Sequence, residues 1–193
     1  MMKKILLFFA LMTAMVGNAQ TGRWINDKDH TRIGFEVKHG GVSFVSGYFG
    51  DFDVTVNAAG EKMLDTKIDV TIKTSSVNTG IAARDKHLRT ADFFDVEKFP
   101  TMTFKSTKIV AESENRGKIY GNLTMRGVTK PIVLDAWFIA KAKSPMNGKM
   151  TAGFRLTGTV KRTDFGLGPK FLPDIVGNEV HLIIDAEFSP EEK

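Results

Sequence analysis

Most of the chain alternates apolar and polar residues, the pattern of β-strands that bury one face and expose the other to water. This alternation predicts one short opening strand and then longer ones, at residues 23–26, 30–39, 46–57, 63–74, 101–110, 118–126, 131–141, 149–161 and 178–188. Short turns rich in glycine, asparagine and proline separate several of them, so successive strands are expected to be antiparallel. Many exceed the usual length of about 5–6 residues. We therefore predict an all-β fold, a closed antiparallel barrel of about eight strands, because closure removes exposed strand edges. An open sandwich is the alternative.

One face of these strands carries the large apolar residues and is predicted to line the barrel interior. Small residues are interspersed on the same face: Gly50, Gly121, Ala136, Ala140, Ala152, Gly158 and Ala186. They allow two interpretations, because a barrel of this size is either filled by its own side chains or holds one small ligand. A cavity with such a wall would be almost entirely apolar and would suit a lipid tail. The residues then expected to contact the tail are Phe35, Phe52, Val70, Phe104, Leu123, Phe138, Phe154 and Leu156.

One segment, residues 83–100, breaks the alternation. It is charged and rich in helix formers, and it ends in Phe99-Pro100, so it predicts a short helical insert between strands. At helical spacing one stripe of this insert is formed by Ile81, Arg84, Asp85 and Leu88. A helix docked through the two apolar members of the stripe would turn the two charged members toward one end of the barrel.

Two interpretations of these charges stay open. Buried charges are usually paired, so the first is an internal ion pair of Arg84 with Asp85, Asp92 or Asp95. The second is contact with a ligand head group, for which phosphate suits a guanidinium. The candidate head-group residues are Arg84 and His87 of the insert and Arg162, which lies where a charged strand end meets a glycine-rich turn.

The N-terminus predicts export. Residues 1–19 combine Lys3-Lys4, an apolar run and Gly17-Asn18-Ala19, the three regions of a secretory signal, so we expect cleavage after Ala19 and one domain at residues 20–193. The chain has no cysteine, which excludes disulfides and lipid attachment at the cleavage site. Loss of Lys3 and Lys4 lowers the net charge from +5 to +3. The remaining charge is spread along the chain and predicts no nucleic-acid partner, although it favours an anionic ligand or a transient contact with a membrane surface.

The polar residues predict no catalytic centre. The four histidines lack the close spacing of metal ligands, and the chain carries no nucleophile elbow or phosphate-binding loop, so no metal, no cofactor and no catalytic residue is expected. The expected protein is a lipid carrier rather than an enzyme, and a homodimer is left open. Two alternatives remain: an enzyme that acts on a lipid with His87, Asp85 or His30 as acid or base, and a filled-barrel interaction protein related to stress.

Several short motifs, in order between Trp24 and Phe188, resemble those of one known family. They are Asp29-His-Thr-Arg-Ile-Gly-Phe35, Gly47-Tyr-Phe49, Ser76-Val-Asn-Thr79, Arg84-Asp-Lys-His-Leu88, Asp92-Phe-Phe-Asp95, Phe104-Lys-Ser106, Gly121-Asn-Leu-Thr124, Gly127-Val-Thr-Lys130 and Arg162-Thr-Asp-Phe-Gly166. Together they resemble the YceI-like family of bacterial periplasmic proteins that bind lipids or polyisoprenoids. The resemblance implies a lipocalin-like barrel in the periplasm, with a long apolar channel for an isoprenoid-like or other amphiphilic lipid that is bound, stored or transported. It does not establish the head-group residues.

Overall fold

The computed structural model describes residues 22–58, 65–145 and 148–191. Within these residues the elements are β1 (Gly22–His39), β2 (Ser43–Phe49), β3 (Phe52–Ala58), β4 (Lys67–Lys73), η1 (Thr74–Ser76), β5 (Val77–Asn78), α2 (Ala82–Leu88), β6 (Thr101–Ala111), β7 (Arg116–Met125), β8 (Val128–Lys143), β9 (Met150–Lys161), η2 (Arg162–Phe165) and β10 (Val176–Pro190). The predicted signal and its cleavage site lie outside the described residues. Among the described helices none has the length and apolar character needed to span a membrane.

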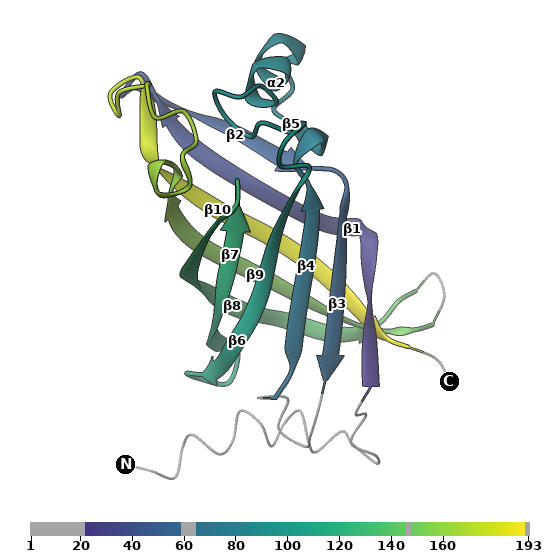
Figure 1. The fold of residues 1–193 in the computed structure, drawn as a ribbon. Helices are drawn as coiled ribbons and strands as arrows, with labels where there is room; N and C mark the ends of the chain where they lie inside the picture. Colours follow the sequence, from purple (N-terminus) through teal and green to yellow (C-terminus); the bar gives the residue numbers. More distant parts are fainter. Residues whose placement is uncertain (1–21, 59–64, 146–147, 192–193) are drawn as a thin grey trace.

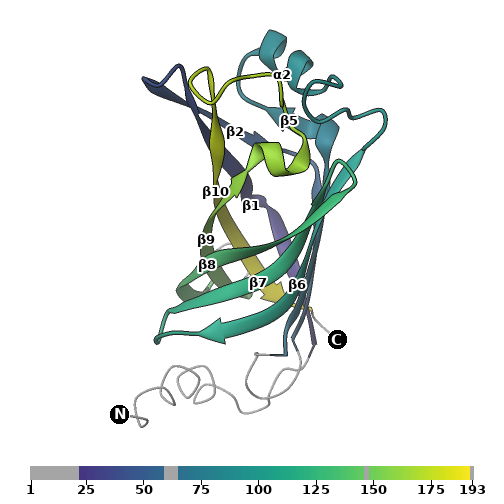
Figure 2. The same cartoon turned by 60° about the vertical axis from the view of Figure 1, so that its left-hand side comes forward.

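Eight antiparallel strands close into a barrel, as the alternation predicted (Figures 1 and 2). Neighbouring strands follow the order β10-β9-β8-β7-β6-β4-β3-β1, and the pairing of β10 with β1 closes the ring. β2 and β5 are additional strands, β2 paired with β1 and β5 paired with β2. We call the end where β1 starts and β10 finishes the lower end, and the end that carries α2 the cap end (Figure 1).

Two predicted strand boundaries are wrong. The segments expected at 23–26 and 30–39 form one strand, β1, because a register shift between Asp27 and Arg32 lets the intervening residues bulge while pairing with β10 continues. The strand expected at 46–57 is divided instead, with β2 ending at Phe49 and β3 starting at Phe52. As a result β1 pairs with β3 only near the lower end and with β2 toward the cap end.

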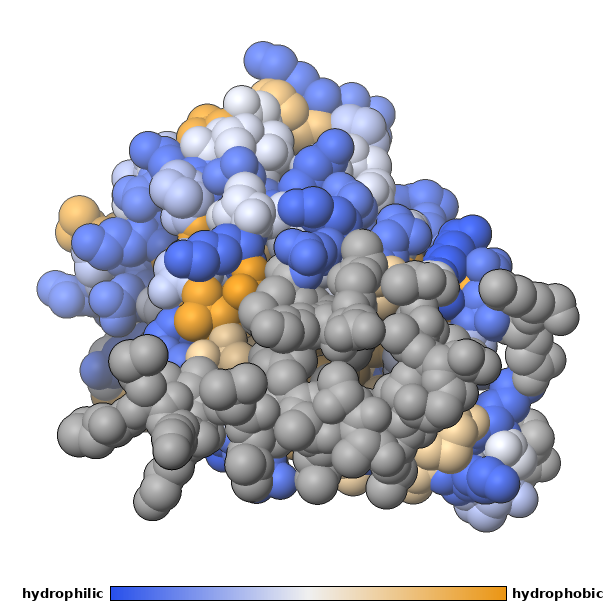
Figure 3. Space-filling view, turned by 90° about the horizontal axis from the view of Figure 1, so that it is seen from below, coloured by the Kyte–Doolittle hydropathy of each residue, from blue (hydrophilic) through white to orange (hydrophobic). Residues whose placement is uncertain are grey.

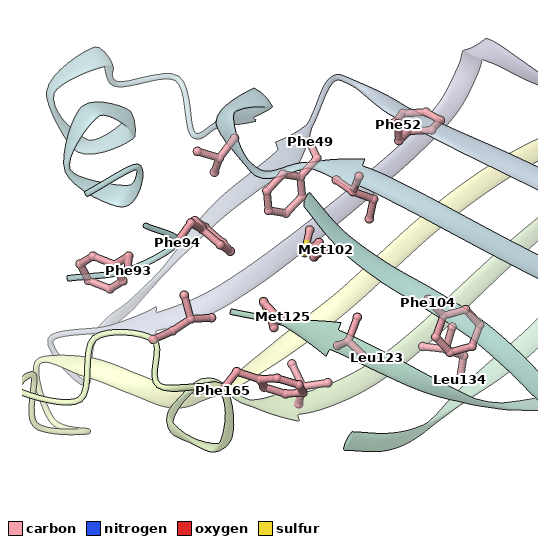
Figure 4. Packing of buried hydrophobic residues seen from close by; sticks show 14 of the residues in the cluster. Phe49, Phe52, Phe93, Phe94, Met102, Phe104, Leu123, Met125, Leu134 and Phe165 are labelled. Carbon is pink, nitrogen blue, oxygen red and sulfur yellow. The ribbon is translucent and has the colours of Figure 1, made fainter. Parts of the chain in front are cut away.

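Of the helical insert predicted at residues 83–100, only the first part is a helix, α2, and residues 89–100 form turns. The insert sits over the cap end together with the segment that joins β9 to β10 (Figure 2). Beneath these segments lies the main cluster of buried apolar residues, shown in Figure 4. Phe93 and Phe94 enter it from the insert, while Met102 and Leu123 enter from β6 and β7. The apolar core of the protein is therefore concentrated at the cap end.

Candidate functional site: an apolar cavity in the barrel

A cavity of about 2030 Å³ occupies the barrel interior. It is lined from Val176 under the cap to Pro190 at the lower end, the two limits of β10. This strand has 15 residues, and at about 3.3 Å per residue and a tilt of about 40° it spans roughly 40 Å along the barrel axis. Drug-sized pockets usually measure about 300–1,000 Å³. The interior is therefore a long channel. The alternative of a barrel filled by its own side chains does not describe this structure.

Most of the predicted tail-contact residues line this cavity. They are Phe35, Val70, Phe104, Leu123, Phe138, Phe154 and Leu156. The eighth, Phe52, lies elsewhere, because it is only 5% exposed and packs in the cluster at the cap end. Several wall residues such as Val70 and Leu156 are only partly buried although they face inward. Inward-facing side chains remain partly exposed in this way when the space beside them is not filled by other side chains.

Five of the small residues predicted on the inward face lie in the barrel wall, and they fall into two groups. Ala136, Ala152 and Ala186 line the cavity and widen it. Gly121 and Gly158 are instead covered by large side chains from neighbouring strands, Phe104 and Leu134, respectively. These two glycines therefore permit close packing of the wall and add no space.

Gly50 and Ala140 were expected on the inward face and are exposed. Gly50 lies in the break between β2 and β3. A register shift between Phe138 and Ala140 in the pairing of β8 with β9 changes the alternation at the second position.

Arg162 lines the cap end of the cavity, but its donors are already used. The residue is 3% exposed, and its guanidinium donates five hydrogen bonds of 2.6–3.0 Å. The acceptors are the backbone carbonyls of Gly177, Leu167, Gly168, Phe171 and Val176. Burial lowers the pKa of Arg162 from its ordinary value. A guanidinium has five N–H groups, so none remains for a head group, and the contacts assign Arg162 to holding the β9–β10 segment.

Arg84, unlike Arg162, does not line the cavity. Its Nε and Nη2 donate to the hydroxyl and the carbonyl of Thr79, at 2.7 and 2.8 Å. Asp85, which is 8% exposed, accepts hydrogen bonds from the backbone N–H and the hydroxyl of the same Thr79. The ion pair expected between Arg84 and an aspartate is thus replaced, within the described residues, by a threonine that bonds to both charged groups.

His87 joins the two cap segments and also lies off the cavity wall. Its Nε2 is 3.2 Å from Asp92 Oδ2, and its ring meets the edges or faces of Phe93 and Phe171 at 5.1 and 5.9 Å. These two phenylalanines stack at 5.2 Å, one from each segment. Lys170 Nζ lies 2.7 Å from Asp92 Oδ1, and this hydrogen bond, followed by that of His87, lowers the pKa of Asp92. The geometry supports a structural contact that closes the cap.

The lower end of the cavity has a different character. Trp24 and Lys141 line it, with Lys141 Nζ 5.7 Å from the centre of the indole ring. Thr66, in the same wall, is 6% exposed, and its hydroxyl finds no hydrogen-bond partner among the described residues. None of the three was predicted as a site residue. The inward parity of Ile68, Val70 and Ile72 extends to Thr66 and was the one available signal.

One group of potential metal ligands occurs among the described residues. Asp27, His30 and Glu187 each place one ligand atom within 4.8 Å of the others. Asp27 and Glu187 are a cross-strand pair next to the bulge of β1, and none of the three lines the cavity. The hydrogen bond between Asp27 and His30 raises the pKa of His30 and lowers that of Asp27. Within this group Asp27 and His30 form a partly exposed ion pair on the surface of the strand, and Glu187 lies beside them.

Known proteins resemble this chain in both sequence and fold. The family model described as "YceI-like domain" matches residues 24–188. The chain belongs to the YceI-like family. Protein YceI of Salmonella arizonae is 40% identical over 190 residues, which cover 96% of this chain and 97% of the relative.

Two solved structures extend the comparison. The YceI protein of Campylobacter jejuni is 39% identical, with a TM-score of 0.72 over 86% of this chain and 96% of that one. A polyisoprenoid-binding domain from Saccharophagus degradans, implicated in plant cell wall breakdown, has a TM-score of 0.62 over 87% of this chain and 98% of its own. Its identity of 14% shows that the YceI-like barrel persists where the sequence has diverged.

Proposed function

We propose that this YceI-like protein binds a long isoprenoid-like lipid inside the barrel and stores or transports it. The observation that carries the proposal is the apolar cavity of about 2030 Å³ that follows the barrel axis. Each methylene that leaves water contributes about 0.8 kcal/mol, so a chain buried in this wall gains enough to offset the cost of association. The proposed tail contacts are the seven predicted residues that line the cavity, Phe35, Val70, Phe104, Leu123, Phe138, Phe154 and Leu156.

The length of the cavity favours a long chain. A bilayer has a hydrocarbon core of about 30 Å, so the chain of one leaflet spans about 15 Å. The cavity spans roughly 40 Å, estimated from the 15 residues of β10. An ordinary acyl chain would leave more than half of it unfilled. The polyisoprenoid-binding domain of Saccharophagus degradans has the same fold, which is consistent with this class of ligand.

The positions of the candidate acids and bases support binding rather than catalysis. Asp85 and His87 belong to the cap and do not line the cavity. His30 is exposed beside the bulge of β1. A general acid or base must lie within hydrogen-bond reach of the reacting group. None of these three side chains meets that requirement for a lipid in the barrel.

The proposal is tested by lipid content and by blocking the cavity. Native mass spectrometry of the purified protein should show a bound isoprenoid, or uptake of added solanesol. Ala136→Phe places a ring in the cavity from a half-buried position and should abolish uptake. The matched control is Ala142→Phe, at an exposed position of the same strand, which should leave uptake unchanged. A wild-type protein that takes up no isoprenoid, or an Ala136→Phe variant that fills normally, would refute the proposal.

Export belongs to the same proposal. We infer that residues 1–19 direct the chain to the periplasm and that the mature protein begins at Gln20. N-terminal sequencing of protein recovered from the periplasmic fraction tests this, and an N-terminus at Met1 would contradict it. The expected homodimer and the transient contact with a membrane surface stay predictions, which size-exclusion chromatography and liposome sedimentation can check.

A further inference from the structure

We propose that the lower end of the cavity holds the head group of the ligand, and that this head group is an anionic oxygen group, a phosphate or a carboxylate. The proposal rests on the proposed function, because it assumes that a lipid occupies the barrel. It places the head group at the end opposite to the helical insert. The tail then lies under the cap.

A buried hydroxyl carries the first step. Thr66 is 6% exposed, lines the cavity and has no hydrogen-bond partner for Oγ1 among the described residues. A buried polar group without a partner costs about 1–3 kcal/mol. A ligand oxygen beside Thr66 would accept this hydrogen bond and remove the penalty. Among the described residues that line the cap end no comparable free donor occurs, since every N–H of the Arg162 guanidinium is hydrogen-bonded.

The positive charge comes from Lys141. Its cross-strand partner is Ala152, which lines the cavity, so Lys141 shares the inward face of β8 and β9. Its one ring or charge interaction among the described residues is with Trp24, and the two carboxylates that line the same end of the cavity, Glu114 and Glu191, do not pair with it. The ammonium is therefore available to an anion at the lower end of the cavity.

Strand register places the hydroxyl on one side of Trp24 and the lysine on the other. Trp24 pairs with Val56, and Val56 pairs with Ile68, which is two residues from Thr66. At about 4.8 Å per strand, β4 lies roughly 10 Å from β1 around the wall. The three residues thus mark one level of the barrel, where an indole ring gives an amphiphile the mixed surface typical of an apolar–aqueous boundary.

The surroundings fit an amphiphile that lies across this boundary. Seen from below, hydrophilic residues predominate around the lower end and apolar residues show between them (Figure 3). Further polar and charged residues line the cavity at the lower ends and turns of the strands: Arg23, Glu114, Asn115, Arg116, Lys118, Lys149 and Glu191. Above them the lining is apolar up to Leu88 and Phe94 beneath the cap, apart from Thr31 and the fully bonded Arg162. A ligand inserted with its tail toward the cap leaves its polar end beside Thr66 and Lys141.

The test compares one isoprenoid with and without a charged head. We expect the wild-type protein to bind solanesyl phosphate about tenfold more tightly than solanesol, which corresponds to a difference of about 1.4 kcal/mol in binding free energy. Thr66→Val removes the hydroxyl at constant shape and should reduce this preference by about threefold. Lys141→Met should reduce it by about threefold, since the ammonium is exposed. Lys141→Met should bind solanesol as the wild type does, and Thr66→Val should weaken solanesol less than solanesyl phosphate, because a neutral hydroxyl accepts a weaker hydrogen bond than a phosphate.

Matched controls separate the site from general effects. Thr71→Val changes an exposed threonine of the same strand as Ile68. Lys143→Met changes an exposed lysine two residues after Lys141 that does not line the cavity. Both should keep the phosphate preference. Near-ultraviolet circular dichroism and the binding of solanesol itself report whether each variant is folded.

The outcomes are distinguishable. If solanesol and its phosphate bind equally, or if both site variants keep the preference, the head-group inference is wrong while the proposed function stands. If the wild type binds neither compound, the proposed function itself fails. Palmitate forms the third arm. Binding of palmitate that weakens in both site variants would show that a carboxylate is accepted and would support the shared anionic chemistry, and palmitate binding that neither variant changes would contradict a carboxylate at this site.

Discussion

Removal of the Arg162 side chain should destabilise the protein far more than removal of an exposed arginine. Its five hydrogen bonds of 2.6–3.0 Å all go to backbone carbonyls, three in the segment that joins β9 to β10 and two at the start of β10. At a net value of about 1 kcal/mol each, the set is worth about 5 kcal/mol, and entry of water into the vacated space lowers this to about 3–5 kcal/mol for Arg162→Ala. The melting temperature should fall by about 6–20 °C for a chain of this size.

Arg155, on the strand β9 that precedes Arg162, provides the matched control. Its guanidinium makes a two-pronged pair with Asp185, at 2.7 and 3.0 Å, but the side chains are 49% and 38% exposed. Solvent-exposed pairs contribute about 0–1 kcal/mol, so Arg155→Ala should change stability little. Arg162→Lys should fall between the two, because an ammonium has three donors for five carbonyls.

Urea unfolding followed by tryptophan fluorescence and circular dichroism measures these differences. A loss below about 1 kcal/mol for Arg162→Ala, similar to that of the Arg155 control, would refute the structural role of the buried guanidinium. The same variants separate structure from ligand contact. Arg162→Lys that retains stability but loses the preference for solanesyl phosphate over solanesol would restore the head-group role predicted from the sequence.

Two further predictions concern close packing and the cap. Gly121→Ala brings Cβ to 2.7 Å from the carbonyl oxygen of Lys105 and against the ring of Phe104, so we expect a loss of about 1–3 kcal/mol in urea unfolding. Gly22→Ala, whose Cβ meets nothing within 4 Å, should change stability by less than about 1 kcal/mol. Asp92 has a pKa lowered from 3.8, so its contribution is present above that pH and is lost as the pH falls through the lowered value. Asp92→Asn should therefore melt below the wild type at pH 7 and alongside it at low pH, and an equal gap at both would contradict this coupling.

The barrel could be predicted because a period of two is unambiguous over long strands. The inward assignment of Val70, Phe104 and Leu156 needs only this period, and each lines the cavity. A bulge adds a residue to one strand, so the alternation after it no longer tells which side chains face inward. For this reason β1 was predicted as two strands and Ala140 was placed on the inward face. Irregularities of this kind depend on pairing with a neighbouring strand, and one strand read alone does not contain them.

The head-group residues could not be predicted for a different reason. A sequence shows that Arg84 and Arg162 carry donors, but it does not show that backbone carbonyls and Thr79 have already taken them. Thr66 is the opposite case, a residue that no sequence pattern marks as a binding residue. A single threonine at an inward position looks like an ordinary strand residue, and its interest comes only from the missing partner for its hydroxyl.

The closure of the ring by β1 and β10 also sets an order of events during synthesis. These are the first and last strands of the described chain, and their pairing runs from Trp24↔Pro190 to His39↔Val176. The neighbouring pairs of the barrel that do not include β10 can form while this C-terminal strand is still absent, but its pairings with β9 and β1 must wait, so the ring stays open along one whole side. Contacts between residues so far apart in sequence form slowly, and until they form the apolar wall faces the surroundings as an open sheet. A lipid that meets the nascent protein at this stage could be enclosed sideways as the last strand zips against the first, without passing through either end of the finished barrel.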